Sequence, residues 1–298
     1  MASKLPPHPV GNRPRQRSQR SRRSDEPVAG LAPATGGADE DSQFVGAVAR
    51  AVAVLNAFRP GDGPLGNAEL AERTGLPKPT VSRLTFTLQH CGYLAYDPRH
   101  RVYELGAGAL ALGALAMSAT HLRRIARPLM QELARSANFN VGLGTRDGQQ
   151  MVYTDACEGE ALIGLRLYAG SRIPVLTTSM GRAWLAGHGP EEAERLIAEL
   201  RPLHDGAGWK ALIAAVGKAR REVAAHGYCV SVGDWQRDIH GAAAPIRHPV
   251  NGRVFAINLG GPAYSLPEKL LHDDLGPRIA RTAAAIERAL DPPDLPPR

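Results

Sequence analysis

Two prolines separated by one residue, Pro77 and Pro79, constrain the fold of this chain more than any other feature. Proline lacks a backbone N–H and fixes its φ angle, so an α-helix accepts it only in the first turn. The preceding residues, Thr74-Gly75-Leu76, have the composition of a tight turn, with Gly75 placed where a left-handed residue commonly ends a helix. The segment therefore predicts a helix that ends near Arg73, a short turn, and a second helix that starts at the prolines.

The flanking pattern extends this pair of helices to a helix, helix, turn, helix, hairpin order. Val45, Val48, Val52 and Leu55 recur at helical spacing and predict a first helix, and Asn67 is expected to cap a second helix over 68–73. The third helix should run to His90. Residues 93–96 and 101–104 predict two strands that pair around a turn at 97–100. This order predicts a winged helix-turn-helix domain over residues 44–105.

The third helix has one apolar side and one polar side. Winding it at about 100° per residue places Val81, Leu84 and Leu88 together as core positions. No acidic residue occurs between Arg73 and Asp97, which suits a helix that enters the major groove of DNA. The residues expected to contact DNA are Lys78, Pro79, Thr80, Ser82, Arg83 and Phe86 on the helix, and Arg99 and Arg101 in the hairpin turn.

These side chains suit different parts of the duplex. Arg83 is the best candidate for a guanine edge, because its planar fork can pair with two acceptors at once. Lys78, Thr80 and Ser82 suit phosphate or base contacts, and the basic hairpin turn suits the DNA backbone or the minor groove.

Beyond residue 105 the pattern changes to an alternation of helices and short strands. A linker helix is expected within 106–120, and its many small residues favour close contact with another helix. Helices are then predicted over 121–135, 180–187, 190–200, 209–225 and 267–290. Strands are predicted over 141–146, 150–156, 161–168, 173–177, 228–232 and 253–259. The segment 233–249 separates the last two strands. Such mixing predicts an α+β domain over 121–290.

The charge of the chain is concentrated at its start. The formal net charge is +7, and residues 1–23 contain seven Lys and Arg and no acid, which leaves the remainder neutral. We expect residues 1–43 and 291–298 to be disordered, and the basic tail either adds nonspecific phosphate contacts or is a solvated leader. The three cysteines are widely spaced, and neither a signal peptide nor a membrane span is evident, so a cytoplasmic location is expected.

Three blocks of sequence resemble one family of proteins. Gly75-Leu76-Pro77-Lys78-Pro79-Thr80-Val81-Ser82-Arg83-Leu84 closely resembles the recognition-helix signature of the IclR family of bacterial transcription regulators. The block Ile173–Ala186 resembles the family's effector-domain signature, and a third block, from Gly227 through 242–246 to 258–262, matches in order and spacing. The resemblance covers residues 44 to about 290. It implies a GAF-like α/β effector-binding domain, joined by linker helices to the winged helix-turn-helix.

The resemblance also implies a pocket on one face of a curved sheet for a small organic acid, including aromatic acids. The family's pocket-lining positions fall on Leu162, Ile173, Ser179, Met180, Ser231, Ile239, Gly241, Asn258 and Gly260. Gly181 joins this set because Ser179-Met180-Gly181 would open a helix whose free N–H groups attract a carboxylate. Ser231 replaces an acidic residue of many relatives and Gly241 replaces Cys or Asn of some, which favours a larger or differently charged ligand. Arg182 and His240 either pair with an anion or have a structural role.

The combined pattern predicts a sequence-specific regulator whose binding to a pseudo-palindromic operator responds to an organic acid. A homodimer that pairs into a homotetramer is expected, and RNA polymerase is a further candidate partner. No cofactor, metal or membrane partner is expected. An enzyme is not expected either, because Cys229-Val230-Ser231-Val232-Gly233 lacks the first glycine of a nucleophile elbow. The alternative is a DNA-binding protein whose C-terminal domain only oligomerises, and ligand-dependent release of DNA distinguishes the two.

Overall fold

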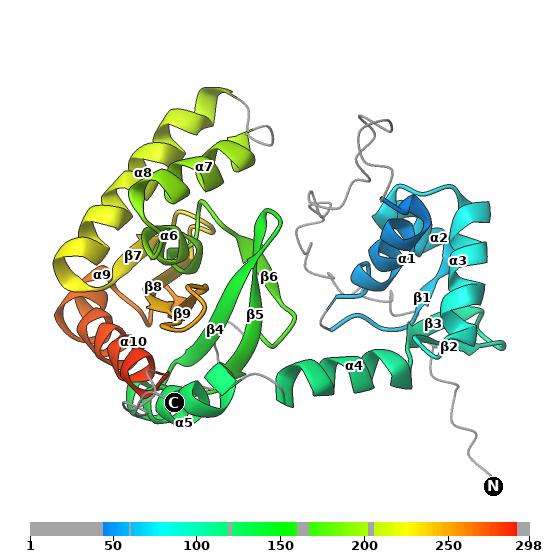
Figure 1. The fold of residues 1–298 in the computed structure, drawn as a ribbon, viewed down its shortest axis with the longest axis horizontal. Helices are drawn as coiled ribbons and strands as arrows, with labels where there is room; N and C mark the ends of the chain where they lie inside the picture. The colour runs from blue at the N-terminus through cyan, green and yellow to red at the C-terminus, as the bar shows by residue number, and fades with distance from the viewer. Residues whose placement is uncertain (1–43, 60, 119–120, 160–166, 202–205, 291–298) are drawn as a thin grey trace, which may run out of the picture.

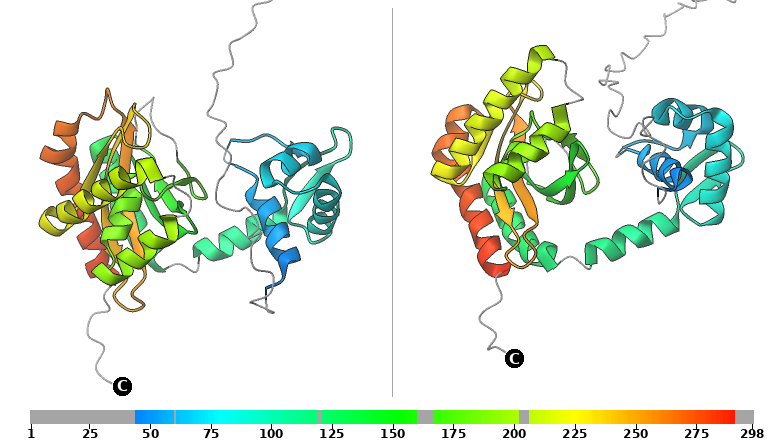
Figure 2. Two further views of the ribbon diagram at one scale, coloured as in Figure 1. Left: turned by 90° about the horizontal axis from the view of Figure 1, so that it is seen from above. Right: turned by 45° about the horizontal axis from the view of Figure 1, so that its top comes forward.

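The chain folds into a small N-terminal domain and a larger α/β domain, joined by helix α4 (Ala107–Ser118) (Figure 1, Figure 2). The structure is a computed structural model that describes residues 44–59, 61–118, 121–159, 167–201 and 206–290. The expectations for the two terminal tails and for Leu162 concern residues outside this range.

The N-terminal domain is the predicted winged helix-turn-helix. It contains α1 (Gly46–Asn56), β1 (Leu65–Gly66), α2 (Asn67–Thr74), α3 (Lys78–His90), β2 (Leu94–Asp97) and β3 (Val102–Leu105). The strands form an antiparallel sheet in the order β1-β3-β2. Strand β1 was not predicted, because a pair of residues is too short to show an alternating pattern.

The turn between α2 and α3 forms as its residues dictate. Gly75 has a φ of 67°, the left-handed conformation expected after a helix end. Pro77 caps α3 and Pro79 lies in its first turn. The expected cap at Asn67 is wrong: Gly66 holds that position, and the Asn67 side chain instead accepts a hydrogen bond from the buried Thr85 hydroxyl at 3.3 Å. This bond ties α2 to α3.

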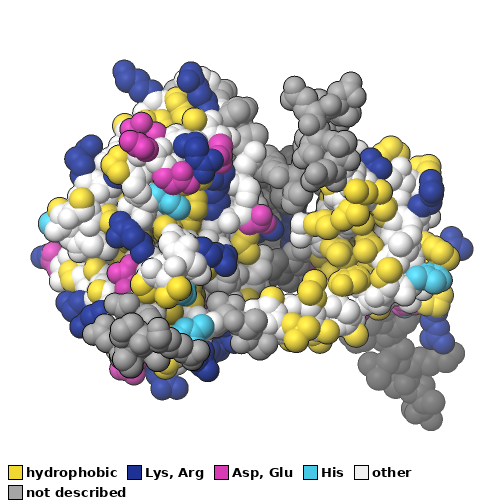
Figure 3. Space-filling view, viewed as in Figure 1, with side chains coloured by type: hydrophobic (Ala, Val, Ile, Leu, Met, Phe, Trp, Pro, Cys, Tyr) yellow, Lys and Arg dark blue, Asp and Glu magenta, His cyan; other side chains and the backbone are white. Residues whose placement is uncertain are grey.

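Helix α1 forms where predicted, but much of its apolar stripe faces outward. Val54 is fully buried, whereas Val48 is 60% exposed and Val52 is 44% exposed. Helix α4 also presents apolar side chains to the surface, with Leu110 at 76% and Leu112 at 58% exposure. Figure 3 shows apolar side chains gathered over these parts of the molecule. Two helices therefore carry apolar surface that the described residues leave exposed.

The C-terminal domain is built on a six-stranded antiparallel sheet in the order β6-β5-β4-β9-β8-β7. Its strands are β4 (Asn140–Asp147), β5 (Gln150–Cys157), β6 (Arg172–Pro174), β7 (Cys229–Val232), β8 (Ile239–Arg247) and β9 (Val254–Pro262). One face is covered by α6 (Ser179–Ala186) and α8 (Gly206–His226), with α7 (Pro190–Leu200) packed on α6. The other face is covered by α5 (His121–Ala137) and by α9 (Glu268–Leu270), η2 (Leu271–Leu275, a π-helical turn) and α10 (Gly276–Leu290).

One strand of this domain was not predicted, and two predicted strands differ from the structure in the residues that it describes. The segment 233–249 contains β8, a central strand that was missed because Gly241, Ala242, Ala243, Ala244 and Pro245 have little preference for strands. Leu167 and Tyr168 are not in a strand, and the rest of the predicted strand 161–168 lies outside the described residues. Strand β6 is also shorter than the predicted 173–177.

Strand β5 contains a β-bulge at Thr154. The pairing with β4 shifts there, because Leu143 pairs with Asp155 whereas Gly144 pairs with Tyr153. The extra residue changes which face the following side chains point to. Tyr153 therefore packs on the α6 side of the sheet, and Cys157 packs on the α5 side. The two halves of one strand belong to different cores.

Candidate functional site

The outer face of α3 is exposed along its length. Val81 and Leu88 are buried against the domain core, as predicted. Lys78, Pro79, Ser82, Arg83 and Phe86 are exposed, and Thr80 is partly exposed. The structure therefore presents all six residues of α3 that the sequence assigned to DNA contact.

The charges around α3 leave its cations available. Arg73 is the cation that the nearby acids engage: it lies 2.5 Å from Asp62 and 2.6 Å from Glu69. Lys78 and Arg83 have no side-chain partner among the described residues. The surface next to α3 is therefore electropositive, which suits a phosphate backbone.

The hairpin turn between β2 and β3 is held by Asp97. Its carboxylate accepts hydrogen bonds from the backbone N–H of Arg99 at 2.8 Å and lies 2.5 Å from His100 Nδ1. Arg101 adopts a left-handed backbone conformation with φ 56°. The turn leaves the side chains of Arg99 and Arg101 exposed at the end of the hairpin.

A hollow lies on the α6 side of the C-terminal sheet, and its volume is about 330 Å³ when space open to solvent is included. It is lined by Tyr153, Leu167, Ile173, Thr178, Ser179, Ser231, Trp235, Ile239, His240, Gly241, Asn258, Leu259 and Gly260. Seven of the ten predicted ligand residues are among them: Ile173, Ser179, Ser231, Ile239, Gly241, Asn258 and Gly260. The hollow combines apolar side chains with a few hydroxyl and amide groups, which is typical of small-molecule sites.

Met180 and Gly181 do not line this hollow. Met180 is fully buried in the core beneath α6. Gly181 packs directly on the backbone of Val175, where a Cβ would overlap the Val175 carbonyl. The Gly181 N–H donates to the Thr178 hydroxyl at 3.2 Å, so the start of α6 already has one internal acceptor. The N–H groups of this helix are thus less open than the sequence predicted.

Gly241 is required for packing. A Cβ at this position would lie 2.9 Å from Leu259 O and 3.2 Å from Ser179 Oγ. Glycine therefore allows β8 to approach β9 and α6 closely, and its small size does not by itself indicate a larger ligand.

An acidic residue lies beside Ser231 although position 231 itself is serine. The Asp234 carboxylate is 3.3 Å from Ser231 Oγ and 2.6 Å from Arg182 NH1. Arg182 is buried and also donates from Nε to Leu176 O at 2.8 Å. This geometry favours the structural role for Arg182, since its charge is neutralised within the domain.

His240 lines the hollow from β8. Its Nδ1 lies 2.9 Å from Leu266 O, which fixes the ring and makes Nδ1 the donor. This leaves Nε2 as the ring nitrogen that is available to the hollow.

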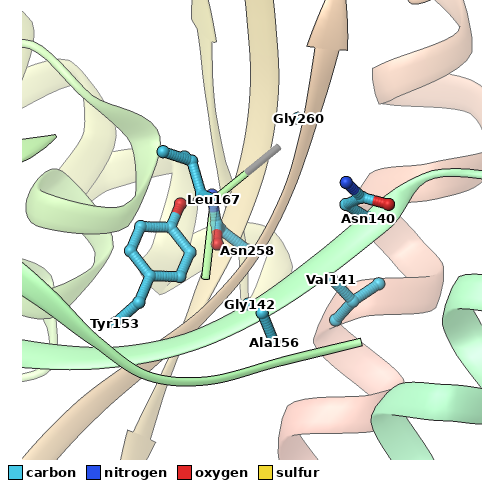
Figure 4. Close-up of a pocket in the computed structure, with 8 residues that line it drawn as sticks. All are labelled: Asn140, Val141, Gly142, Tyr153, Ala156, Leu167, Asn258 and Gly260. Carbon is cyan, nitrogen blue, oxygen red and sulfur yellow. Dashed lines mark hydrogen bonds between the residues drawn. The ribbon is translucent and has the colours of Figure 1, made fainter. Parts of the chain in front are cut away.

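Tyr153 and Asn258 are the buried polar pair of the hollow. Asn258 Nδ2 donates a hydrogen bond to Tyr153 Oη at 2.9 Å. Figure 4 shows the hydroxyl end of Tyr153 directed toward Asn258 and Leu167. Tyr153 was not predicted as a site residue, because an alternating strand pattern does not say which face holds a ligand. Trp235, Thr178 and Leu167 were missed as well.

Asp155 connects the same strand to α5. Its carboxylate is buried and lies 2.5 Å from Arg127 Nη1. It also lies 3.0 Å from Arg123 Nε, an ion pair whose geometry does not make a hydrogen bond. The hydrogen bond to Asp155 raises the pKa of Arg127. Two cations of α5 are thereby held by one residue of β5, two positions after Tyr153.

Neither metal chemistry nor a reactive thiol is indicated by the described part of the chain. No group of three His, Cys, Asp or Glu side chains in it is placed to hold a metal ion. Burial raises the pKa of the Cys229 thiol to about 12 and also raises that of Cys157. No helix in the described ranges is long and apolar enough to cross a membrane.

A DNA-binding domain joined through a helix to an α/β domain with its own hollow defines the class of two-domain transcription regulators. Residues 47–98 match the IclR helix-turn-helix domain, and residues 114–288 match the bacterial transcriptional regulator IclR C-terminal domain. The chain belongs to the IclR family of transcriptional regulators. The expectation that it is not an enzyme is confirmed by this membership.

Individual relatives agree with the family. The chain is 34% identical over 257 residues to the HTH-type transcriptional regulator TsaQ1/TsaQ2 of Comamonas testosteroni, covering 85% of this chain and 92% of the relative. An IclR family regulator from Brucella abortus has the same fold, with a TM-score of 0.72 and 40% identity over 87% of this chain and 98% of that structure. An IclR homologue from Microbacterium hydrocarbonoxydans in complex with 4-hydroxybenzoate shares the fold, with a TM-score of 0.63, 22% identity, and coverage of 82% and 98%.

Proposed function

We propose that this regulator binds a pseudo-palindromic operator and that a small organic acid in the C-terminal hollow changes its operator affinity. The exposed, acid-free face of α3 is the observation that carries the first part. Arg83 contacts a base edge, while Lys78, Arg99 and Arg101 contact phosphates or the minor groove. The regulator acts in the cytoplasm, where its DNA lies, and RNA polymerase is a candidate partner there.

A second copy of the chain covers the apolar surfaces of α1 and α4. Helix α4 has no charged residue, and Leu110 and Leu112 are among its exposed side chains. An exposed helix that is apolar all round is typical of an interface. Such a homodimer presents two recognition helices to the two halves of an operator, and two dimers form the proposed homotetramer.

The dimer is tested by measuring its mass in solution. Leu112→Glu places a charge in the interface and should yield a monomer by light scattering, while Glu104→Gln, an exposed change in the same region, should leave the dimer intact. A dimer that persists in Leu112→Glu, and in the double variant with Leu110→Glu, contradicts an α4 interface.

The hollow favours a sensor over the alternative of a domain that only oligomerises. A domain used for oligomerisation alone needs apolar surface, whereas this hollow is lined by buried hydroxyl and amide groups of Ser179, Ser231 and Asn258. Polar groups that converge in an apolar cleft are typical of small-molecule sites.

Signal transfer is proposed to pass along β5 to α5. Tyr153 contacts the hollow and Asp155 holds Arg123 and Arg127 of α5, the helix that follows linker helix α4 in the chain. A ligand that moves the first half of β5 shifts the equilibrium between two positions of α5, and thereby the spacing of the recognition helices.

The experiment begins with selection of an operator from random oligonucleotides by the full chain. Organic acids, starting with 4-hydroxybenzoate and benzoate, are then titrated against the operator complex while DNA release is measured. Selection of a symmetric sequence and a change in affinity with at least one acid are expected. A protein that selects no sequence overturns the DNA-binding proposal, and acids that bind the protein without changing operator affinity overturn the coupling.

A further inference from the structure

Two neighbouring hollows on the α6 side of the sheet meet at the Tyr153 side chain. The larger has about 330 Å³ and the smaller about 240 Å³ of open space. Both are lined by Tyr153, Leu167, Asn258 and Gly260 (Figure 4). The buried Tyr153 side chain therefore lies at the boundary between the two hollows, next to a ligand bound in either one.

The hydrogen bond between Asn258 and Tyr153 leaves the tyrosine proton unused. Asn258 Nδ2 is the donor and Tyr153 Oη the acceptor, at 2.9 Å. The hydroxyl hydrogen points elsewhere, and no group among the described residues accepts it. Burial raises the pKa of the Tyr153 hydroxyl above its usual range, so the proton stays on the oxygen at neutral pH. This hydrogen can therefore be donated to an acceptor that enters the hollow.

The position of this hydroxyl is fixed by the surrounding backbone. A Cβ at Gly142 would overlap the Tyr153 ring, so the ring lies directly on β4. Tyrosine also has few rotatable bonds, in contrast to the small hydroxyl of Ser179, which can rotate. A donor held in place before the ligand arrives gives more selectivity than one that must be ordered on binding.

The rest of the lining consists of apolar walls and a few neutral polar groups. Its described residues include no Lys, Arg, Asp or Glu, and Leu167, Ile173, Trp235 and Ile239 form apolar walls. Apolar walls suit the faces of a ring, and a hydroxyl donor is matched by an oxygen that carries lone pairs.

Resting on the proposed sensor function, we propose that Tyr153 is a specificity-determining residue that donates its hydroxyl hydrogen to a carboxylate or carbonyl oxygen of a single-ring effector. Asn258 is the positioning residue, because its amide occupies the oxygen and leaves the hydrogen for the ligand. The carboxylate and carbonyl forms share this chemistry, and the choice of probes separates them.

The test compares four probes of one ring on the full chain by calorimetry. Benzoate and 4-hydroxybenzoate carry a carboxylate, benzamide carries a neutral carbonyl, and toluene carries no acceptor. Tyr153→Phe keeps the ring and removes the donor, and Tyr264→Phe, at a side chain that is 75% exposed, is the matched control. For each oxygen-bearing probe that binds the wild type, Tyr153→Phe should lower the affinity by about tenfold. The affinity for toluene should stay the same, and the control should change neither affinity.

A second variant tests the direction of the hydrogen bond. Asn258→Asp keeps the tyrosine hydroxyl but provides a carboxylate that accepts its hydrogen, so the donor is no longer available to a ligand. Benzamide, which has no charge to repel, should then lose affinity as it does in Tyr153→Phe. Thermal melting confirms that each variant is folded before binding is measured.

Three outcomes overturn the inference. One is unchanged affinity for every oxygen-bearing probe in Tyr153→Phe, and another is an equal loss for toluene. The third is a preparation that selects an operator sequence yet binds none of the oxygen-bearing probes, a result that leaves DNA binding intact. Probes that bind through Tyr153 without changing operator affinity contradict the proposed coupling and not the role of this residue.

Discussion

The two domains place their functional residues in opposite ways. In the N-terminal domain the residues assigned to DNA lie within 78–86 of α3 or close together in one hairpin turn, and almost all are exposed. In the C-terminal domain the hollow gathers residues from Tyr153 to Gly260, and several of them are buried. A helix exposes a site through its own periodicity, whereas a sheet builds one from strand register. The first kind of site is local, and the second depends on the whole domain.

The largest expected effect tests whether the domains are independent. Gly181→Ala places a methyl group against the Val175 carbonyl and should destabilise the C-terminal domain by about 3 kcal/mol or more. The N-terminal domain should keep its melting transition. Calorimetry of the full chain measures both transitions.

Gly217→Ala is the control for that substitution. Gly217 lies within α8, where a new Cβ would meet only the flexible end of Arg221, so alanine should be neutral or stabilising there. Loss of both transitions in Gly181→Ala would show that the two domains unfold as one unit.

Arg83 separates base recognition from charge in the N-terminal domain. On the proposal that its planar fork pairs with a base, Arg83→Ala should cost about 1–3 kcal/mol of binding free energy at the selected operator and much less on random DNA. Arg83→Lys keeps the charge and should recover little of the loss. Equal weakening on both DNAs, measured by fluorescence anisotropy, would instead make Arg83 a phosphate contact.

Asp155 tests the connection between the hollow and α5. Asp155→Asn removes a buried charge from two arginines and should cost about 1–2 kcal/mol of stability, with faster hydrogen exchange in α5. Asp147→Asn breaks an exposed pair with Arg172 and should cost almost nothing. Equal exchange rates of α5 in the two variants would remove Asp155 from the signal route.

The smallest effect is chemical and leaves the fold unchanged. Cys91 is exposed at the end of α3, while Cys157 and Cys229 are buried. Because burial raises the pKa of both buried thiols, they stay protonated and unreactive near neutral pH. Brief alkylation of the native protein, followed by mass spectrometry, should modify Cys91 alone. Early modification of Cys229 would show that the C-terminal domain opens readily.

The sequence was sufficient to place α3 and to identify its exposed side, because those signals are local. Gly75, Pro77 and Pro79 fix where α3 begins, and the spacing of Val81 and Leu88 decides which side is buried. The same periodicity did not show that Val48 and Val52 of α1 are exposed. An apolar stripe on a helix can pack against another protein as well as against the core of its own domain.

In the C-terminal domain the family blocks located Ser231, Asn258 and Gly260, but the local pattern could not locate Tyr153 or Asp155. Met151, Tyr153, Asp155 and Cys157 alternate as if they shared one face. The bulge at Thr154 separates them, and nothing in the composition of the strand marks it. Strand β8 was missed for a related reason. Its small residues allow close packing against β9 and α6, and they have little preference for strands.

The bulge places the two ends of β5 in different cores, so each end can be mutated without changing the contacts of the other. A substitution at Tyr153 changes a side chain that lines the hollow, whereas a substitution at Asp155 changes the ion pairs that hold α5. A changed side chain at position 153 therefore leaves the ion pairs between Asp155 and α5 in place. Deleting Thr154 would leave Tyr153 opposite Gly144 and Asp155 opposite Leu143, so both side chains would keep their faces and the strand would lose only the local bend of the bulge.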